Sequence, residues 1–285
     1  MSFTERPFNA FLTRYMKNFR RLVILAMLAL TGASFSTLLA EKTRTPEGVG
    51  VDQKLSAQIP LDTEFYNEKG EKVKLDSFFQ SGRMPVILAP SYFECPRLCT
   101  LVFNGLSKAM NQMGKSGLKP GKDYRAISLS FNPEDTPKLA REKGDRYRST
   151  IKSQKVTEEG WEFLTGDRES IHAVLDSVGY SYKKDTEGSF SHPAAIILIT
   201  PEGKVSSYLF GFDYNPTDMR LALVEASSGK IGSLTDAVLL TCFRFDPQKG
   251  KYTTDVMNVM KIMALVVIAF LVGLVIFLYR KERNT

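Results

Sequence analysis

Residues 59–228 alternate between short apolar runs and longer stretches in which apolar residues recur at helical spacing. Short apolar runs bounded by turn residues predict strands, and the longer periodic stretches predict helices. The predicted elements are hairpins at 63–75 and 194–210, strands at 85–89, 124–131 and 161–164, and helices at 98–113, 136–151, 167–178 and 218–227. Such alternation is typical of parallel β-α units.

The order of these elements narrows the fold class. A buried strand leads directly into a pair of cysteines at the start of a helix, and a late hairpin followed by a last helix closes the pattern. This is the order of a thioredoxin-like α/β domain, which we predict for residues 59–228. The composition, 43% hydrophobic and 24% charged, excludes a disordered or collagen-like chain.

Two long apolar segments flank the predicted domain. Residues 22–40 carry no charge, follow a basic stretch and end in small residues, as a secretory signal does. We therefore predict a signal peptide or N-terminal membrane anchor at 1–40 and a linker at 41–58. Residues 262–279 are eighteen uncharged residues, nearly enough to cross a hydrocarbon core of ~30 Å. They predict a C-terminal transmembrane helix, which follows an extension at 229–261.

The net charge of +7 lies at the two ends of the chain. The first 21 residues hold five basic residues and one acid, and residues 261–285 hold four basic residues and one acid, which accounts for the whole charge. Residues 41–260 are therefore neutral, which excludes a basic groove for nucleic acid. Basic residues beside a membrane segment stay on the cytoplasmic side. We expect residues 280–285 to be a cytoplasmic tail, and the chain to sit in a bacterial inner membrane with its soluble domain facing the periplasm.

The chain has three cysteines, Cys95, Cys99 and Cys242, which are too few for a fold held together by disulfides. Cys95 lies between the strand at 85–89 and a helix start, where unpaired amides and the helix dipole favour a thiolate. We therefore expect Cys95 to be the more acidic and more exposed thiol of the pair. Cys99 follows one turn later on the same helix face. The two sulfurs can close a disulfide, exchange disulfides with a partner as a redox pair, or hold a soft metal ion together.

An imidazole would complete a metal site, and the chain has two histidines. His172 lies on the charged helix predicted at 167–178 and is interpreted as a surface or packing residue. His192 lies in a loop that runs through Pro193 into a strand of the late hairpin. In a thioredoxin-like sheet this loop packs against the helix start that carries the cysteines, so we expect His192 to approach the two sulfurs.

Four features together resemble the Sco/SenC family of copper chaperones that serve the assembly of respiratory oxidases. They are the cysteine pair with three intervening residues after an apolar strand, the segments 128–137 and 161–166, and the His192 loop before the last hairpin. The resemblance implies that Cys95, Cys99 and His192 bind a copper ion as Cu(I) or Cu(II). Thiolates suit Cu(I), and an added imidazole lets the same site hold Cu(II).

The resemblance also implies a function. A Sco/SenC protein delivers copper to the dinuclear copper site of cytochrome c oxidase, or reduces the thiols of that site. The implied partners are the copper-accepting subunit of a respiratory oxidase and a thiol reductant protein, because the cysteines must be reduced before copper binds. On this interpretation the chain is a metallochaperone rather than an enzyme.

Two features depart from the family pattern. Ser191 precedes the histidine, where many members have an acid. The acid that would orient the imidazole then has to come from elsewhere, with Asp185 and Glu187 as the candidates. The surest anchor is also C-terminal rather than N-terminal, and the extension at 229–261 lies outside the part of the chain that resembles the family.

Three other functions stay open on the sequence alone. A metal-free thiol-disulfide reductase would use Cys95 to attack a partner disulfide and Cys99 to resolve the mixed disulfide. Peroxidase chemistry expects a hydroxyl residue suited to peroxide three positions before the reactive cysteine, and Tyr92 at that position weakens this alternative. A non-enzymatic interaction module would tolerate replacement of both cysteines by serine.

The third cysteine and a methionine cluster are further candidates. Cys242 is interpreted as a small buried apolar residue, with copper ligation, thiol exchange and an intermolecular contact as alternatives. Met257, Met260 and Met263 fall three apart where the chain enters the predicted membrane segment. Packing in a helix is favoured for them over binding of Cu(I).

Overall fold

The computed structural model describes the predicted domain almost completely and the C-terminal segment in part. The described residues are 48–80, 84–95, 98–186, 188–227, 240, 243–246, 251–254, 260–261, 263–268, 270 and 273. The chain divides into two compact units, Met1–Arg44 and Thr45–Thr285. All described residues belong to the second unit, so the signal peptide or anchor predicted at 1–40 lies outside them.

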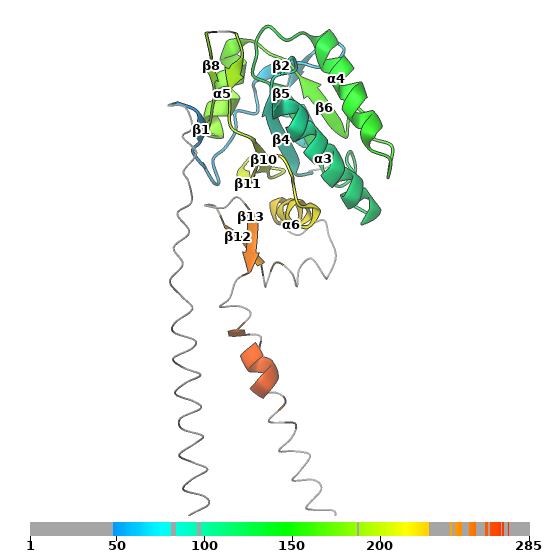
Figure 1. Cartoon of the computed structure of the whole chain (residues 1–285), viewed down its shortest axis with the longest axis vertical. Helices are drawn as coiled ribbons and strands as arrows, with labels where there is room; N and C mark the ends of the chain where they lie inside the picture. The colour runs from blue at the N-terminus through cyan, green and yellow to red at the C-terminus, as the bar shows by residue number, and fades with distance from the viewer. Residues whose placement is uncertain are drawn as a thin grey trace, which may run out of the picture. The chain divides into compact units, whose positions relative to one another are not determined.

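A five-stranded sheet forms the centre of the domain (Figure 1). Its strands, in spatial order, are β11 (Val205–Phe210), β10 (Ala195–Ile199), β4 (Val86–Ser91), β5 (Arg125–Ser130) and β6 (Trp161–Leu164). The strands β4, β5 and β6 run parallel, and β10 pairs antiparallel with both β4 and β11. Every residue of β4, β5 and β10 is buried, as expected for strands that are covered on both faces. The predicted strands and the late hairpin are confirmed.

The helices of the domain are α3 (Leu98–Lys115), α4 (Pro137–Thr150), α5 (Arg168–Ser177) and α6 (Pro216–Ala226). Helix α3 contacts both α4 and α6, and Figure 1 shows α3 and α4 side by side. Thr136 and Asp167 cap the first amides of α4 and α5, which begin where the sequence predicts. Helix α6 begins two residues before the predicted residue 218, because Asn215 caps it and Pro216 takes its first position. The thioredoxin-like α/β order is confirmed.

A buried ion pair fastens the first hairpin to the rest of the domain. The hairpin is formed by β2 (Glu64–Tyr66) and β3 (Lys72–Lys74), as predicted. Glu68 in its turn accepts from Arg148 of α4 through both carboxylate oxygens, at 2.5 and 2.7 Å. The amide of Phe163 in β6 donates to the same carboxylate at 3.1 Å. The pair therefore joins the hairpin to α4 and to the edge of the central sheet.

Several short elements were not predicted, because pairs of two to four residues leave too little periodicity. They are β1 (Gly50–Val51) with β7 (Tyr180–Ser181), β8 (Lys183–Lys184) with β9 (Phe190–Ser191), β12 (Phe243–Asp246) with β13 (Lys251–Thr254), and the helix α2 (Ser77–Gln80). Strand β1 lies within the segment 41–58 that is expected to be a linker. Beside β7, Gly179 has φ +65°, and a Cβ there would lie 1.8 Å from the carbonyl oxygen of Asp52. Only glycine fits this position.

The predicted transmembrane segment, 262–279, lies partly outside the described residues. Within the part of the chain that the structure describes, no helix is long and apolar enough to cross a membrane. Residues 263–268 are helical, and their apolar side chains are exposed, as are those of Met260 and Met263 at 62% and 59%. Cys242 and Met257 lie outside the described residues, so the interpretations made for them stay predictions.

Candidate metal centre

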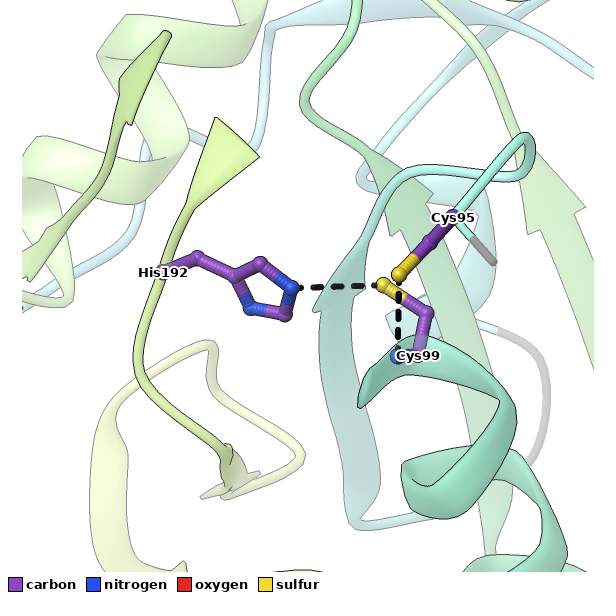
Figure 2. Close-up of side chains that lie close together, drawn as sticks. All are labelled: Cys95, Cys99 and His192. Atoms are coloured by element: carbon purple, nitrogen blue, oxygen red, sulfur yellow. Dashed lines mark hydrogen bonds between the residues drawn. The ribbon is translucent and has the colours of Figure 1, made fainter. Parts of the chain in front are cut away.

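Three segments of the fold carry the candidate ligands to one place (Figure 2). Strand β4 ends at Ser91, and Cys95 follows in the loop that leads to α3. Cys99 is the second residue of α3, and His192 lies between β9 and β10. One ligand atom from each residue, two Sγ atoms and one imidazole nitrogen, lies within 4.8 Å of the other two. The structure thus brings together the three residues that the sequence singled out.

Nitrogen atoms lie close to both sulfur atoms. Nε2 of His192 lies 3.5 Å from Sγ of Cys99, and Figure 2 shows the imidazole pointing at this sulfur. The backbone amide of Cys99 donates to Sγ of Cys95 at 3.3 Å, and the amide of Tyr92 donates to Sγ of Cys99 at 3.4 Å. Each sulfur therefore receives a backbone N–H, which stabilises negative charge on it. The helix start acts on Cys95 as the sequence predicts.

Both cysteines are thiols, and both are buried, with 6% of Cys95 and 2% of Cys99 exposed. Cys95 is the more exposed of the two, as predicted, although both thiols are buried. The Cys95 amide donates to the Tyr92 carbonyl at 3.3 Å, and this turn directs the sulfur into the core. A hydrogen bond with Cys95 and burial both raise the pKa of the Cys99 thiol, so it stays protonated at neutral pH without a metal. Burial and a hydrogen bond to Cys95 raise the pKa of Tyr92 to about 12.

Aromatic rings and two polar groups hold the imidazole of His192. The ring of Tyr92 meets it edge-on at a centroid distance of 6.0 Å, and the ring of Phe131 lies at 5.1 Å. On the far side of the imidazole, Nδ1 lies 3.1 Å from the Tyr180 hydroxyl and 3.0 Å from the carbonyl oxygen of Pro193. Because Nδ1 faces these polar partners, the other nitrogen is directed at the sulfurs.

A buried carboxylate holds the loop that carries Cys95. Asp135, 6% exposed, accepts hydrogen bonds from the amide of Phe93 at 2.6 Å, the hydroxyl of Ser130 at 2.6 Å and the side-chain amide of Asn132 at 3.1 Å. Burial raises the pKa of Asp135, and the three hydrogen bonds act in the opposite direction. Because Phe93 lies two residues before Cys95, this carboxylate fixes the backbone from which the cysteine projects.

The other candidates lie elsewhere in the domain. His172 is exposed on α5 and stacks on Tyr182 at a centroid distance of 5.7 Å, in agreement with a surface or packing role. Asp185 accepts the amide of Ser189 at 2.8 Å, at the turn between β8 and β9, and Glu187 lies outside the described residues. Among the described residues, the groups that meet Nδ1 of the site histidine are a phenol and a backbone carbonyl rather than the acid that the family pattern suggests.

Two residues of this site were not predicted from the sequence. Asp135 lies within the segment 128–137 that carries the family resemblance, so its place in that motif was an available signal. No such signal pointed to Tyr180, because it lies in a two-residue strand whose pairing with β1 leaves no pattern in the sequence.

The donor set fits a soft metal ion. Thiolate sulfur binds zinc at about 2.3 Å and imidazole nitrogen at about 2.0 Å, so donors that share such an ion lie roughly 4 Å apart. The observed spread of up to 4.8 Å requires only a small contraction. Thiolates favour Cu(I), and imidazole also suits Cu(II). The adjacent sulfurs are equally able to take part in thiol-disulfide exchange.

The fold and the site place this protein in the class of thioredoxin-like domains that hold two thiols and an imidazole beside the first turn of a helix. Residues 52–226 match the family model described as SCO1/SenC. The chain therefore belongs to the SCO1/SenC family. No curated protein sequence matches the chain.

Two solved structures with a TM-score above 0.5 share the fold. A proposed electron transfer protein from Aquifex aeolicus VF5 is 24% identical, with 62% of this chain and 96% of that chain covered and a TM-score of 0.54. A proposed electron transport protein from the same organism is 24% identical, with coverage of 61% and 99% and a TM-score of 0.51. The structure of Arabidopsis thaliana ScoI with copper bound is 18% identical, with coverage of 61% and 98% and a TM-score of 0.46.

Proposed function

We propose that the protein is a copper chaperone that binds Cu(I) or Cu(II) through Cys95, Cys99 and His192 and delivers it to the dinuclear copper site of a cytochrome c oxidase. One observation carries this proposal: three donors of the type that copper prefers, from three segments of the fold, lie within 4.8 Å of one another. Membership of the SCO1/SenC family supports the same function.

Copper is the cargo of this site, and the chain supplies its ligands and their protonation states. The thiols have to be reduced before copper binds, and binding releases their protons. The backbone amides that already donate to the two sulfurs lower the cost of forming thiolates. Cargo leaves by ligand exchange when cysteines of the acceptor displace these sulfurs. A thiol reductant protein and the copper-accepting oxidase subunit are the partners that this cycle requires.

The proposed location is a bacterial inner membrane with the soluble domain facing the periplasm. The exposed apolar side chains of helical residues 263–268 support a membrane helix at 262–279, since such a surface is costly in water. The basic residues at both ends of the chain support cytoplasmic termini. The layout proposed from the sequence is kept, with a leader or anchor at 1–40, a linker at 41–58, the domain at 59–228 and an extension at 229–261.

A second candidate function is thiol-disulfide reduction of cysteines in oxidase subunits. The amide of Cys99 that donates to Sγ of Cys95 favours it, because this contact stabilises a nucleophilic thiolate. The Cys95 thiolate would attack a partner disulfide, forming a mixed disulfide and releasing one partner thiolate. The Cys99 thiol would then give its proton to the released partner thiolate and attack the mixed disulfide, which releases the second partner sulfur and leaves an oxidised pair here and a reduced partner. This cycle makes no use of His192.

Copper titration of the full chain, reduced and in detergent, separates the two functions. The chain offers matched controls, because each proposed ligand type has a counterpart elsewhere: Cys242→Ser for the cysteines and His172→Ala for the histidine. We expect one copper per chain, with Cu(II)-thiolate absorption bands that are altered in His192→Ala and lost in Cys95→Ser/Cys99→Ser. Both control variants should titrate like the wild type.

The opposite pattern would favour the reductase. Absence of copper binding at micromolar concentration, together with disulfide exchange that is as fast in His192→Ala as in the wild type, would reject the chaperone function. Loss of copper binding in His172→Ala or Cys242→Ser alone would show that the ligand set is wrong.

A further inference from the structure

Three groups form a hydrogen-bonded triangle behind the imidazole of His192. The Tyr180 hydroxyl donates to the carbonyl oxygen of Pro193 at 2.7 Å. The same hydroxyl lies 3.1 Å from Nδ1 of His192, and Nδ1 lies 3.0 Å from the Pro193 oxygen. None of these three contacts uses Nε2, the nitrogen that lies 3.5 Å from Sγ of Cys99. The triangle therefore fixes the orientation of the ring without occupying its ligand atom.

The number of protons in this triangle decides the tautomer of the histidine. A carbonyl oxygen only accepts, so the single proton of the Tyr180 hydroxyl is used in the short contact to Pro193. The phenol oxygen can then only accept from Nδ1, and the Pro193 oxygen also only accepts. Nδ1 must therefore carry the proton of a neutral imidazole, and Nε2 keeps its lone pair. This lone pair faces Sγ of Cys99 at 3.5 Å, where it accepts from the protonated thiol.

We infer that Tyr180 is a positioning residue, which holds His192 as the Nδ1–H tautomer with its Nε2 lone pair aimed at the sulfurs. It takes the place of the acid that the family pattern puts beside the histidine and that Ser191 does not supply. In metal sites, partners of this kind set the tautomer and the orientation of the ligating ring. The inference rests on the proposed function for its effect on copper, whereas its effect on the tautomer is a property of the chain alone.

The backbone around Tyr180 is held firmly enough for this role. Tyr180 is 1% exposed, and its backbone in β7 pairs with that of Val51 in β1. The next residue towards the N-terminus, Gly179, packs against Asp52, whose amide donates to the Gly179 carbonyl at 2.8 Å. Strand β1, which lies outside the central sheet, therefore holds the backbone that positions the Tyr180 hydroxyl.

The test measures the tautomer in the copper-free protein. Full chain labelled with ¹⁵N at histidine gives signals from two residues only, and a His172→Gln variant assigns them. Tyr180→Phe removes the hydroxyl and keeps the ring. Tyr124→Phe is the matched control, because Tyr124 is 0% exposed and its hydroxyl has no hydrogen-bond partner among the described residues.

We expect His192 to show the Nδ1–H form in the wild type and in Tyr124→Phe, and the Nε2–H form to gain population in Tyr180→Phe. The copper dissociation constant should rise about 10- to 100-fold in Tyr180→Phe only. An Nε2–H form in the wild type would overturn the inference, and this outcome can be measured even if the variants do not fold. An unchanged tautomer in Tyr180→Phe would overturn it as well. If the wild type binds no copper, the proposed function fails, while the tautomer still decides the role of Tyr180.

Discussion

Replacing Asp135 by alanine tests whether a buried carboxylate holds the loop that carries the first cysteine. The substitution leaves the Phe93 amide, the Ser130 hydroxyl and the Asn132 side-chain amide without their acceptor, in a place where Asp135 is 6% exposed. An unsatisfied buried donor costs about 1–3 kcal/mol, so three of them would cost roughly 3–9 kcal/mol.

Two effects reduce this cost. The Ser130 hydroxyl can turn to the Asn132 carbonyl oxygen, which lies at 3.5 Å. Burial raises the pKa of Asp135, which shows that the ionised carboxylate itself is poorly solvated, and alanine removes that charge. We therefore expect the free energy of unfolding to fall by about 3–5 kcal/mol in Asp135→Ala. Asp135→Asn keeps one acceptor oxygen and should cost about 1–2 kcal/mol.

Urea unfolding of the full chain in detergent, followed by fluorescence, measures both values. The chain has one tryptophan, Trp161, and it is fully buried. Asp123→Ala is the control, because its carboxylate accepts the amide of Lys119 at 2.7 Å in an exposed place. A cost below about 1 kcal/mol for Asp135→Ala, or one no larger than that of Asp123→Ala, would show that Asp135 does not hold this loop, since water would then replace the lost acceptor.

Three further predictions follow from packing and charge. Burial raises the pKa of Glu162 from 4.5 to about 7, so the free energy of unfolding should fall as the pH rises between these values. The loss should be less than about 3 kcal/mol, since the carboxylate is partly solvated. The urea midpoints measured at pH 5 and pH 8 should differ less in Glu162→Gln than in the wild type. Glu68→Gln removes the buried carboxylate beside Arg148 and leaves that charge paired only with the exposed Asp145. Thermal unfolding should therefore show a loss of up to about 3–5 kcal/mol, whereas Glu68→Met/Arg148→Met should cost less. Gly179→Ala places a Cβ 1.8 Å from the Asp52 oxygen, so amide hydrogen exchange at β1 and β7 should become faster, and unchanged exchange would contradict the predicted clash.

The sequence alone predicts the central sheet and its helices, because each is long enough to leave a periodic pattern. The hairpin at 194–210 is an example, since two apolar runs flank a Pro-Glu-Gly turn. Where prediction failed, the element was short or its contact partner was distant in sequence. Strand β1 has two residues, and it exists because β7, more than a hundred residues later, offers it a partner.

The candidate site shows the same division. The spacing of Cys95 and Cys99 and the place of His192 before a strand were enough to predict these three residues. The groups around them could not be predicted, because hydrogen bonds such as those of Asp135 and Tyr180 depend on side-chain directions that no sequence pattern encodes. The near-complete burial of Cys95 could not be predicted either, because the turn closed by its amide and the Tyr92 carbonyl leaves no pattern in the sequence.

X-ray absorption of the copper-loaded full chain counts the atoms bound to the metal and so tests the ligand set itself. With Cu(I) bound at one equivalent, we expect two sulfur ligands and one imidazole nitrogen. His192→Ala should lose the nitrogen and keep the sulfurs, and His172→Ala should leave the spectrum unchanged. Copper bound without sulfur, or a nitrogen ligand that persists in His192→Ala, would contradict a site built from Cys95, Cys99 and His192.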